Sequence, residues 1–210
     1  MSWSLNEVDA MAKKALRGAG YSWGMAEEAG KATRWLCARD LDGCGALLDL
    51  LENTDGTALT EWGPIIDGPD WRARGDLLCP LITGAAISDF AHKLRDTPIR
   101  CGNIIQPILL VPFVATAAWQ NGATLTLSCR GMTAITDGRD LCITGAPPAG
   151  VDELTITSGG QLGTLGVIST RAQAAPATWA ALGQFAQRTF APASEESRRK
   201  GAGSGLSDND

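Results

Sequence analysis

The side chains best suited to nucleophilic or acid–base chemistry are one cysteine and one histidine. Cys44 lies between two glycines at the expected start of a helix, where the helix dipole and free backbone amides favour a thiolate. We therefore expect Cys44 to be the thiol most readily alkylated at neutral pH. His92 is the only histidine, so any Ser–His–acid or Cys–His arrangement has to use it. The alternative for Cys44 is a small buried side chain without a chemical role. The alternative for His92 is an imidazole that faces solvent or has its hydrogen bonds made within the fold.

A second candidate site joins a tryptophan to two arginines. Trp71, Arg72 and Arg74 fall within a segment rich in turn-forming residues. A guanidinium in such a segment can hold a carboxylate or phosphate through two parallel hydrogen bonds. These residues predict a small anionic metabolite as the ligand. The alternative is that both arginines are solvated or paired with acidic residues.

The last stretch of the chain, residues 194–210, is a tail rich in glycine and charge. Glycine permits a close backbone approach to a ligand, and aspartate supplies negative charge. We expect its last ten residues to be ordered and to be needed for function rather than for folding, the alternative being a frayed, solvated terminus. Its candidate ligand-binding residues are Gly201, Gly203, Gly205, Asp208 and Asp210.

Neither a metal nor an organic cofactor is expected. The six cysteines are widely spaced, none forms a C-x-x-C pair, and the chain has a single histidine, so the ligand pattern of a structural zinc site is missing. No glycine fingerprint follows a strand and opens a helix, as a dinucleotide site requires. Reduced, mostly buried thiols in a cytoplasmic protein are the expected state of the cysteines.

The candidate residues have to be positioned by a single α+β domain over residues 1–193. A helical part is expected over about 1–53, an irregular loop over about 54–76 and a helix over about 176–190. Three helices make up the first part. Ser4 and Glu7 fit a capping box that begins the first helix, and Ser22 precedes the second helix.

The part of the chain from about 104 to 170 is expected to be mostly β. The apolar run Ile104–Trp119 is interpreted as a buried strand, and Asn121-Gly122 predicts a hairpin to the alternating segment 123–129. Two more hairpins are expected, one joining 132–136 to 141–144 around Asp137-Gly138 and one joining 154–157 to 166–170 around Gly159-Gly160. The predicted fold is therefore N-terminal helices, an antiparallel β-meander of five or six strands, a C-terminal helix and a glycine-rich tail.

The net charge and the first residues exclude some classes of partner and of targeting signal. The 210 residues include 18 lysines and arginines against 23 aspartates and glutamates, a net charge of −5. A negative protein does not attract nucleic acid or an anionic membrane, so neither is expected as a partner. The first residues lack a basic and an apolar region, so no secretory signal is expected.

Three stretches of sequence resemble an uncharacterised bacterial family, a domain of unknown function. They are Ser4-Leu5-Asn6-Glu7, the run from Ser22 to Ala32, and the run from Arg198 to Asp210. The resemblance implies no activity, substrate or cofactor.

Two functional hypotheses follow from these features. The first is an enzyme or enzyme subunit of small-molecule metabolism that binds a small anionic metabolite. The second is a non-catalytic accessory protein that docks a partner protein, which the lack of a strong catalytic motif favours. A homo-oligomer is compatible with either hypothesis.

Overall fold

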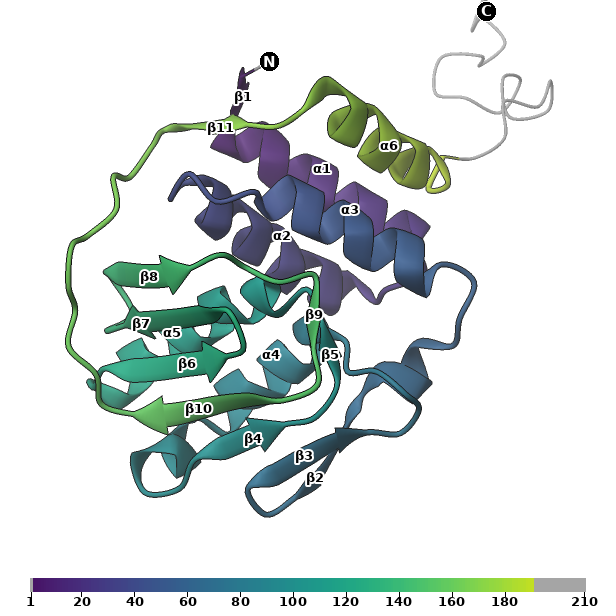
Figure 1. Ribbon diagram of the computed structural model, residues 1–210. Coiled ribbons are helices and arrows are strands. Elements are labelled where there is room, and N and C mark those ends of the chain that lie inside the picture. The colour runs from purple at the N-terminus through teal and green to yellow at the C-terminus, as the bar shows by residue number, and fades with distance from the viewer. Residues whose placement is uncertain (1, 191–210) are drawn as a thin grey trace, which may run out of the picture.

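The computed structural model describes residues 2–190, in which a layer of helices packs against two further helices that lie on one face of a sheet (Figure 1). The helical layer consists of α1 (Leu5–Gly18), α2 (Trp23–Cys37), α3 (Gly43–Thr54) and α6 (Pro176–Gln187). The helices beside the sheet are α4 (Pro80–Asp89) and α5 (Val111–Asn121), and short 3-10 helices span Leu59–Trp62, Ala91–Arg95 and Pro107–Leu110. The fold is α+β, as expected.

The main sheet has seven strands in the order β2-β3-β4-β10-β6-β7-β8. Their bounds are β2 (Pro64–Asp67), β3 (Asp70–Ala73), β4 (Ile99–Cys101), β6 (Leu125–Cys129), β7 (Met132–Thr136), β8 (Leu141–Gly145) and β10 (Leu154–Ser158). All neighbours are antiparallel except β3 and β4, which run parallel. The expected meander is present as β6-β7-β8, but the sheet exceeds the five or six strands predicted. Two further pairs join β1 (Ser2–Ser4) to β11 (Arg171–Gln173) and β5 (Ile104–Ile105) to β9 (Gly150–Val151).

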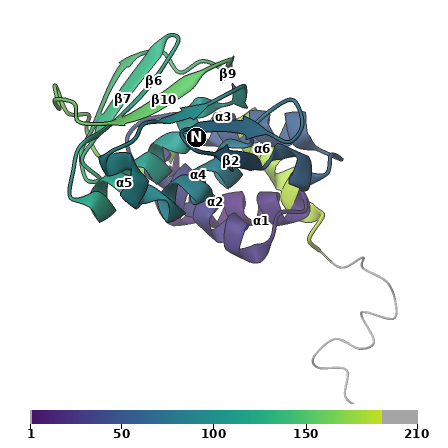
Figure 2. The same cartoon turned by 90° about the horizontal axis from the view of Figure 1, so that it is seen from below.

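One face of the sheet is covered by α4 and α5, which lie beneath β6, β7 and β10 in Figure 2. Leu125 and Leu127 of β6 are fully buried and alternate with Thr126 and Ser128, which are only partly covered. This period of two is typical of a sheet with one face in the core and one face nearer to solvent.

The N-terminus of α1 forms as the sequence predicts. The Glu7 amide donates to the Ser4 hydroxyl at 3.2 Å, and the Ser4 amide donates to the Glu7 carboxylate at 2.7 Å. This capping box satisfies two backbone donors that a helix start otherwise leaves free. Ser22 likewise caps α2 by accepting from the Met25 amide.

The apolar run Ile104–Trp119 is not a strand, contrary to the prediction. It holds the two-residue strand β5, a 3-10 turn and helix α5, whose first seven residues, from Val111 to Ala117, are buried apart from Thr116. Gly122, expected in a hairpin turn, is the left-handed C-cap of α5 with φ 60°. A helix that is apolar on most sides has no amphipathic period, so its sequence is hard to distinguish from that of a buried strand.

Two further segments differ from the prediction, residues 54–76 and the residues around Gly159-Gly160. The segment 54–76, expected to be irregular, contains the β2-β3 hairpin, in which Asp67 pairs with Asp70 around Gly68 at φ 58°. Gly159-Gly160 does not join two paired strands, because β10 leads instead into residues 159–170, which cross to the helical layer before β11. We call residues 159–170 the crossover segment. The hairpin expected around Asp137-Gly138 is confirmed as β7-β8.

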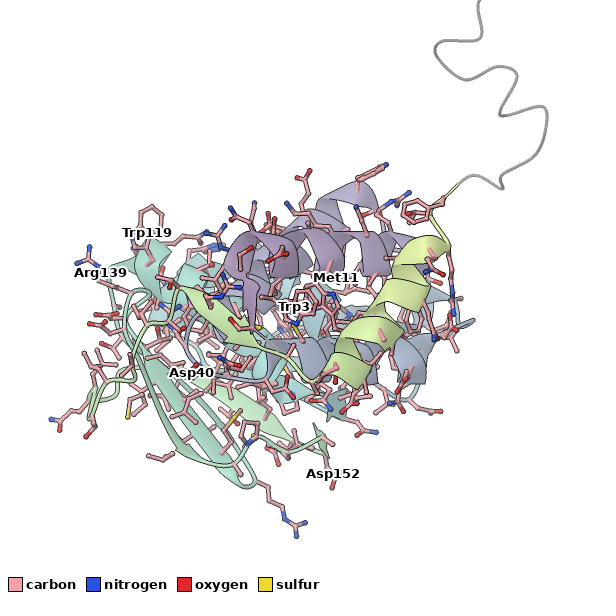
Figure 3. The ribbon with its side chains drawn as sticks, turned by 90° about the horizontal axis from the view of Figure 1, so that it is seen from above. Trp3, Met11, Asp40, Trp119, Arg139 and Asp152 are labelled. Carbon is pink, nitrogen blue, oxygen red and sulfur yellow. The ribbon has the colours of Figure 1, made fainter. Side chains whose placement is uncertain are left out.

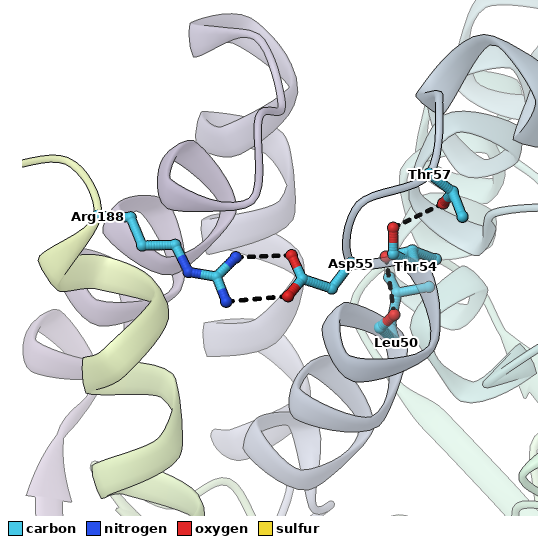
Figure 4. Close-up of polar contacts among 5 residues, drawn as sticks. All are labelled: Leu50, Thr54, Asp55, Thr57 and Arg188. Carbon is cyan, nitrogen blue, oxygen red and sulfur yellow. Dashed lines mark hydrogen bonds and ion pairs between the residues drawn. The ribbon is translucent and has the colours of Figure 1, made fainter.

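Helix α6 is tied to the end of α3 by an ion pair. The Arg188 guanidinium donates two hydrogen bonds to the Asp55 carboxylate, at 2.6 and 2.9 Å (Figure 4). Asp55 is the C-cap of α3, and Arg188 is the C-cap of α6. The contact links the ends of these two helices, and α6 itself packs mainly along α1.

Candidate functional site

Cys44 occupies the expected helix start but is not an exposed thiol. It is the second residue of α3, and its side chain is 1% exposed because this turn of the helix faces the core. The sulfur–sulfur hydrogen bond with Cys37, at 3.8 Å, together with burial raises the pKa of Cys44 above that of an ordinary thiol. These observations conflict with Cys44 as the most readily alkylated thiol.

His92 lies apart from Cys44. It is an exposed residue of the 3-10 helix Ala91–Arg95, and its ring lies 6.4 Å from the ring of Phe90. Among the described residues, no hydrogen bond joins His92 to a cysteine, serine or acidic side chain. The two candidate catalytic residues therefore do not form a catalytic pair.

The Trp71, Arg72 and Arg74 cluster is divided by the pleat of β3. Trp71 is 1% exposed and packs edge-on against Phe90 in the core, whereas Arg72 points to the opposite, exposed face. Arg74 is exposed just beyond the strand. Because neighbouring strand residues point to opposite faces, the tryptophan and the arginines do not line one pocket. The tail residues Gly201, Gly203, Gly205, Asp208 and Asp210 lie outside the described residues.

The structure has a different pocket, which lies between the middle of the crossover segment, strand β8 and the turn that joins α2 to α3. Its volume is about 280 Å³. We call it the crossover pocket; it is lined by Arg39, Leu41, Arg139, Asp140, Leu141, Ile143, Thr164, Leu165, Gly166 and Ile168. Five of the ten lining residues are aliphatic and three are charged, so the pocket offers both apolar surface and groups that can fix a polar ligand.

Glycines and two backbone contacts hold the crossover segment in place. The Gly159 amide donates to the Thr124 carbonyl at 2.7 Å, and the Ser169 amide donates to the Ala38 carbonyl at 2.7 Å. Gly160 has φ 117°, and a Cβ there would lie 2.3 Å from the Thr126 hydroxyl. Only glycine lets the backbone pass this close to the sheet. The segment is therefore fixed at both ends, and the pocket lies near its middle.

Arg39 supplies the positive charge of the crossover pocket. Its guanidinium lies 3.5 Å from the centre of the Trp35 ring and donates to the Trp35 and Arg139 carbonyls at 3.2 and 2.7 Å. Burial lowers the pKa of Arg39, and the nearby Asp140 carboxylate partly opposes that effect. Within residues 2–190, no carboxylate lies within ion-pair distance of Arg39. A half-buried guanidinium that stacks on an aromatic ring is a natural partner for a carboxylate or phosphate.

Apolar side chains are exposed on the crossover segment and at the end of α5. Leu165, Val167 and Ile168 are 47%, 77% and 63% exposed, and Trp119 at the end of α5 is 74% exposed. Trp119 contacts the β7-β8 turn, since a Cβ on Gly138 would lie 2.5 Å from its side chain. Figure 3 shows Trp119 and Arg139 at the same end of the molecule, away from Asp152.

The arrangement is suited to binding rather than to covalent chemistry. The crossover pocket has no cysteine, serine or histidine in its lining. Across residues 2–190, no three His, Cys, Asp or Glu side chains gather closely enough to hold a metal ion. Nor does any helix in this part of the chain combine the length and apolar character needed to cross a membrane.

Sequence reasoning missed every residue of the crossover pocket. Arg39 was one of thirteen arginines and had no motif around it. The apolar residues after Gly166 carried the one available signal, but residues 166–170 were predicted to form a strand.

The chain was compared with curated proteins, solved structures and protein families. No curated protein matches the chain. Among solved structures, the fold is similar to malate dehydrogenase from Entamoeba histolytica, with 11% identity and a TM-score of 0.42 over 72% of this chain and 48% of that one. The chain thus spans about half the length of that enzyme, and the likeness is too weak to support any functional argument.

The second similarity is to a protein family. The family model covers the capping box at Ser4 and the run from Ser22 to Ala32, so the expected resemblance to a domain of unknown function is confirmed there. Residues 3–75 of this chain match the family described as "Protein of unknown function (DUF3726)".

Proposed function

We propose that this protein binds a small carboxylate with an apolar body in the crossover pocket, as an enzyme or enzyme subunit of small-molecule metabolism. The observation that carries the proposal is the half-buried guanidinium of Arg39, which has no ion-pair partner among the described residues and lies in a pocket whose lining is half aliphatic. A ligand carboxylate would accept charge-assisted hydrogen bonds from this guanidinium. Its apolar body would cover Leu41, Ile143 and Ile168.

The charges near the pocket favour a singly charged ligand. Asp140 also lines the pocket and would repel a second negative group. Thr164 offers a hydroxyl for one further polar contact. A compact monocarboxylate therefore fits the pocket better than a di- or triphosphate.

The proposal is tested with two ligands of nearly equal shape, hexanoate and hexanamide, titrated into the full chain and followed by NMR. Loss of a charge-assisted hydrogen bond should cost hexanamide about ten-fold in affinity relative to hexanoate. Arg39→Gln should remove that preference, and Asp140→Asn should strengthen hexanoate binding. Arg74→Gln, which changes an exposed arginine outside the pocket, is the matched control and should leave binding unchanged.

Equal affinity for the two ligands, or an unchanged preference in Arg39→Gln, would contradict the proposal. Arg39 also stacks on Trp35, so its variant needs a check on folding. Arg39→Lys keeps the charge, loses the paired donors, and should retain part of the preference.

A second candidate function is the docking of a partner protein, which the exposure of Leu165, Val167 and Ile168 on the crossover segment favours. Exposed apolar side chains that lie together mark interaction surfaces. The arginines beside them, Arg39 and Arg139, specify a partner segment whose apolar side chains are flanked by carboxylates. A synthetic peptide of alternating leucine and glutamate should shift the NMR signals of the crossover segment, and polyglutamate should not.

A further inference from the structure

Two buried cysteines meet where α2 ends and α3 begins. Cys37 is the last residue of α2 and Cys44 the second residue of α3. Their side chains are 5% and 1% exposed, and their sulfur atoms lie 3.8 Å apart. All six cysteines are within the described residues, and no other pair of them makes a sulfur–sulfur contact.

The chain between the two cysteines is shaped to bring them together. A Cβ on Gly43 would lie 3.2 Å from the Cys37 sulfur and 2.8 Å from the Thr33 carbonyl oxygen, so a glycine is needed for α3 to start this close to α2. The turn also requires Asp40 in the left-handed region, at φ 56°, one of two non-glycine residues with positive φ among residues 2–190. Such a conformation persists only where the surrounding structure imposes it.

The surroundings of the two sulfur atoms assign them different roles. The Cys44 thiol and the backbone amides of Gly43 and Cys44 all face the Cys37 sulfur, and these hydrogen bonds lower the pKa of Cys37 despite its burial. The start of α3 thus favours a thiolate at Cys37 rather than at Cys44, whose pKa is raised. Cys37 is the better nucleophile, and Cys44 is placed to react with it afterwards.

We propose that Cys37 and Cys44 are a redox modification site, which a peroxide converts into a reversible intramolecular disulfide. The Cys37 thiolate attacks a peroxide oxygen, the O–O bond breaks, and Cys37 becomes a sulfenic acid while hydroxide leaves and is protonated to water. The Cys44 sulfur then attacks the Cys37 sulfur, the S–O bond breaks, and a second water leaves. Two thiols and one hydrogen peroxide thus give one disulfide and two waters.

The movement required of the sulfur atoms is small. The sulfurs must approach from 3.8 Å to about 2.05 Å. The turn between the two helices contains no buried large side chain, and Asp40 and Asp42 within it are exposed. In a reducing compartment, such a pair stays as thiols until an oxidant is present, which is the usual behaviour of redox-sensing cysteines.

The site of trypsin cleavage makes the disulfide directly detectable. Trypsin cuts after Arg39, so the two cysteines fall on separate peptides, 35–39 and 40–72. The folded full-length protein is treated with hydrogen peroxide, its remaining thiols are blocked with N-ethylmaleimide, and the digest is analysed by mass spectrometry. We expect the two peptides to be joined with the loss of two hydrogen atoms, and to separate again after dithiothreitol.

Single-cysteine substitutions then show which cysteine carries out each step. Cys44→Ser should stop the linkage and leave a sulfenic acid on Cys37, which dimedone traps. Cys37→Ser should leave Cys44 unmodified. Cys129→Ser is the matched control, since that half-buried thiol lies on β6, and it should leave the linkage intact.

The outcome in the unaltered protein decides the proposal without relying on any variant to fold. If peptides 35–39 and 40–72 remain separate while both cysteines are alkylated, or if Cys37 is oxidised to a sulfinic acid without linkage, the proposal is wrong. Linkage of either cysteine to Cys129 or Cys142 would also overturn it. Ligand binding at the crossover pocket is not part of this readout, so the two proposals stand or fall separately.

Discussion

The helical layer and the crossover segment use apolar residues in opposite ways. In α1 and α2, the apolar side chains recur at helical spacing and are buried, among them Val8, Leu16 and Leu36. Both helices begin with a serine cap. In the crossover segment, Leu165, Val167 and Ile168 face solvent although their sequence is as apolar as that of a core strand.

This difference indicates what each region contributes. Burial of apolar area is the main favourable term in folding, so the helical layer carries stability. The exposed residues of the crossover segment add little to it. Their apolar surface remains available to a ligand or partner, which is the basis of both functions proposed above.

The largest effect that separates the two regions is expected from truncation in the core. Leu16→Ala removes a fully buried side chain of α1, where that helix packs against α2 and α6. It should lower the free energy of unfolding by about 2–5 kcal/mol, because a cavity replaces lost contacts. Urea denaturation followed by circular dichroism measures the change. A loss below about 1 kcal/mol would show that the helical layer is not the stabilising region.

A smaller effect is expected at the first cap. Ser4→Ala removes the hydroxyl that accepts from the Glu7 amide and should lower the free energy of unfolding by about 1 kcal/mol. Ser4→Asp is the control, since aspartate is also a good N-cap and should preserve stability. Equal destabilisation by both substitutions would contradict a capping role.

The same cap predicts a dependence on pH. Hydrogen bonds from the backbone and side chain of Ser4 lower the pKa of Glu7. The ionised carboxylate therefore stabilises the folded state above the ordinary glutamate pKa of about 4.3, and this contribution is lost as the pH falls through the lowered value. The difference in stability between the unaltered protein and Glu7→Gln should thus shrink in acid. Denaturation curves at several pH values below neutrality test this.

The helices that sequence predicted correctly are those with local signals. Ser4 and Ser22 mark helix starts through their own hydrogen bonds, and the apolar stripe of α1 has a clear period. Helix α5 was wrongly predicted to be a strand. It is buried on nearly all sides, so residues such as Phe113 and Val114 show no helical period and are equally typical of a buried strand. The Asn121-Gly122 pair then appeared to be a hairpin turn, although it ends a helix.

The crossover pocket could not be found from local patterns because distant segments form it. Arg39 follows α2, Arg139 lies in the β7-β8 turn, and Ile168 belongs to the crossover segment. The guanidinium of Arg39 is positioned by a hydrogen bond to the Arg139 carbonyl, one hundred positions away in the sequence. No local sequence motif predicts such a contact. By contrast, Trp71, Arg72 and Arg74 are adjacent in sequence but separated by the strand pleat. Adjacency in sequence was therefore a poor guide to a shared site.

The smallest change in stability is expected in the crossover segment, at Val167. Val167→Ser replaces a side chain that is 77% exposed and does not line the crossover pocket. The free energy of unfolding should stay within about 0.5 kcal/mol of the unaltered protein, because little buried area is lost. Urea denaturation beside Leu16→Ala makes the comparison direct, and a loss above 1 kcal/mol would show that the segment packs more firmly than its exposure indicates.

The same variant distinguishes the two proposed functions. If the segment serves only as one wall of a ligand pocket, Val167→Ser should bind hexanoate as well as the unaltered protein does, since Arg39 and the aliphatic lining are intact. If the segment is a docking surface, the leucine–glutamate peptide should bind several-fold more weakly, because an exposed apolar contact at an interface is lost. A fall in peptide binding with unchanged hexanoate binding would assign the outer face to a partner and the inner face to a ligand. Unchanged binding of both would remove Val167 from either role and leave the docking function without its most exposed aliphatic residue.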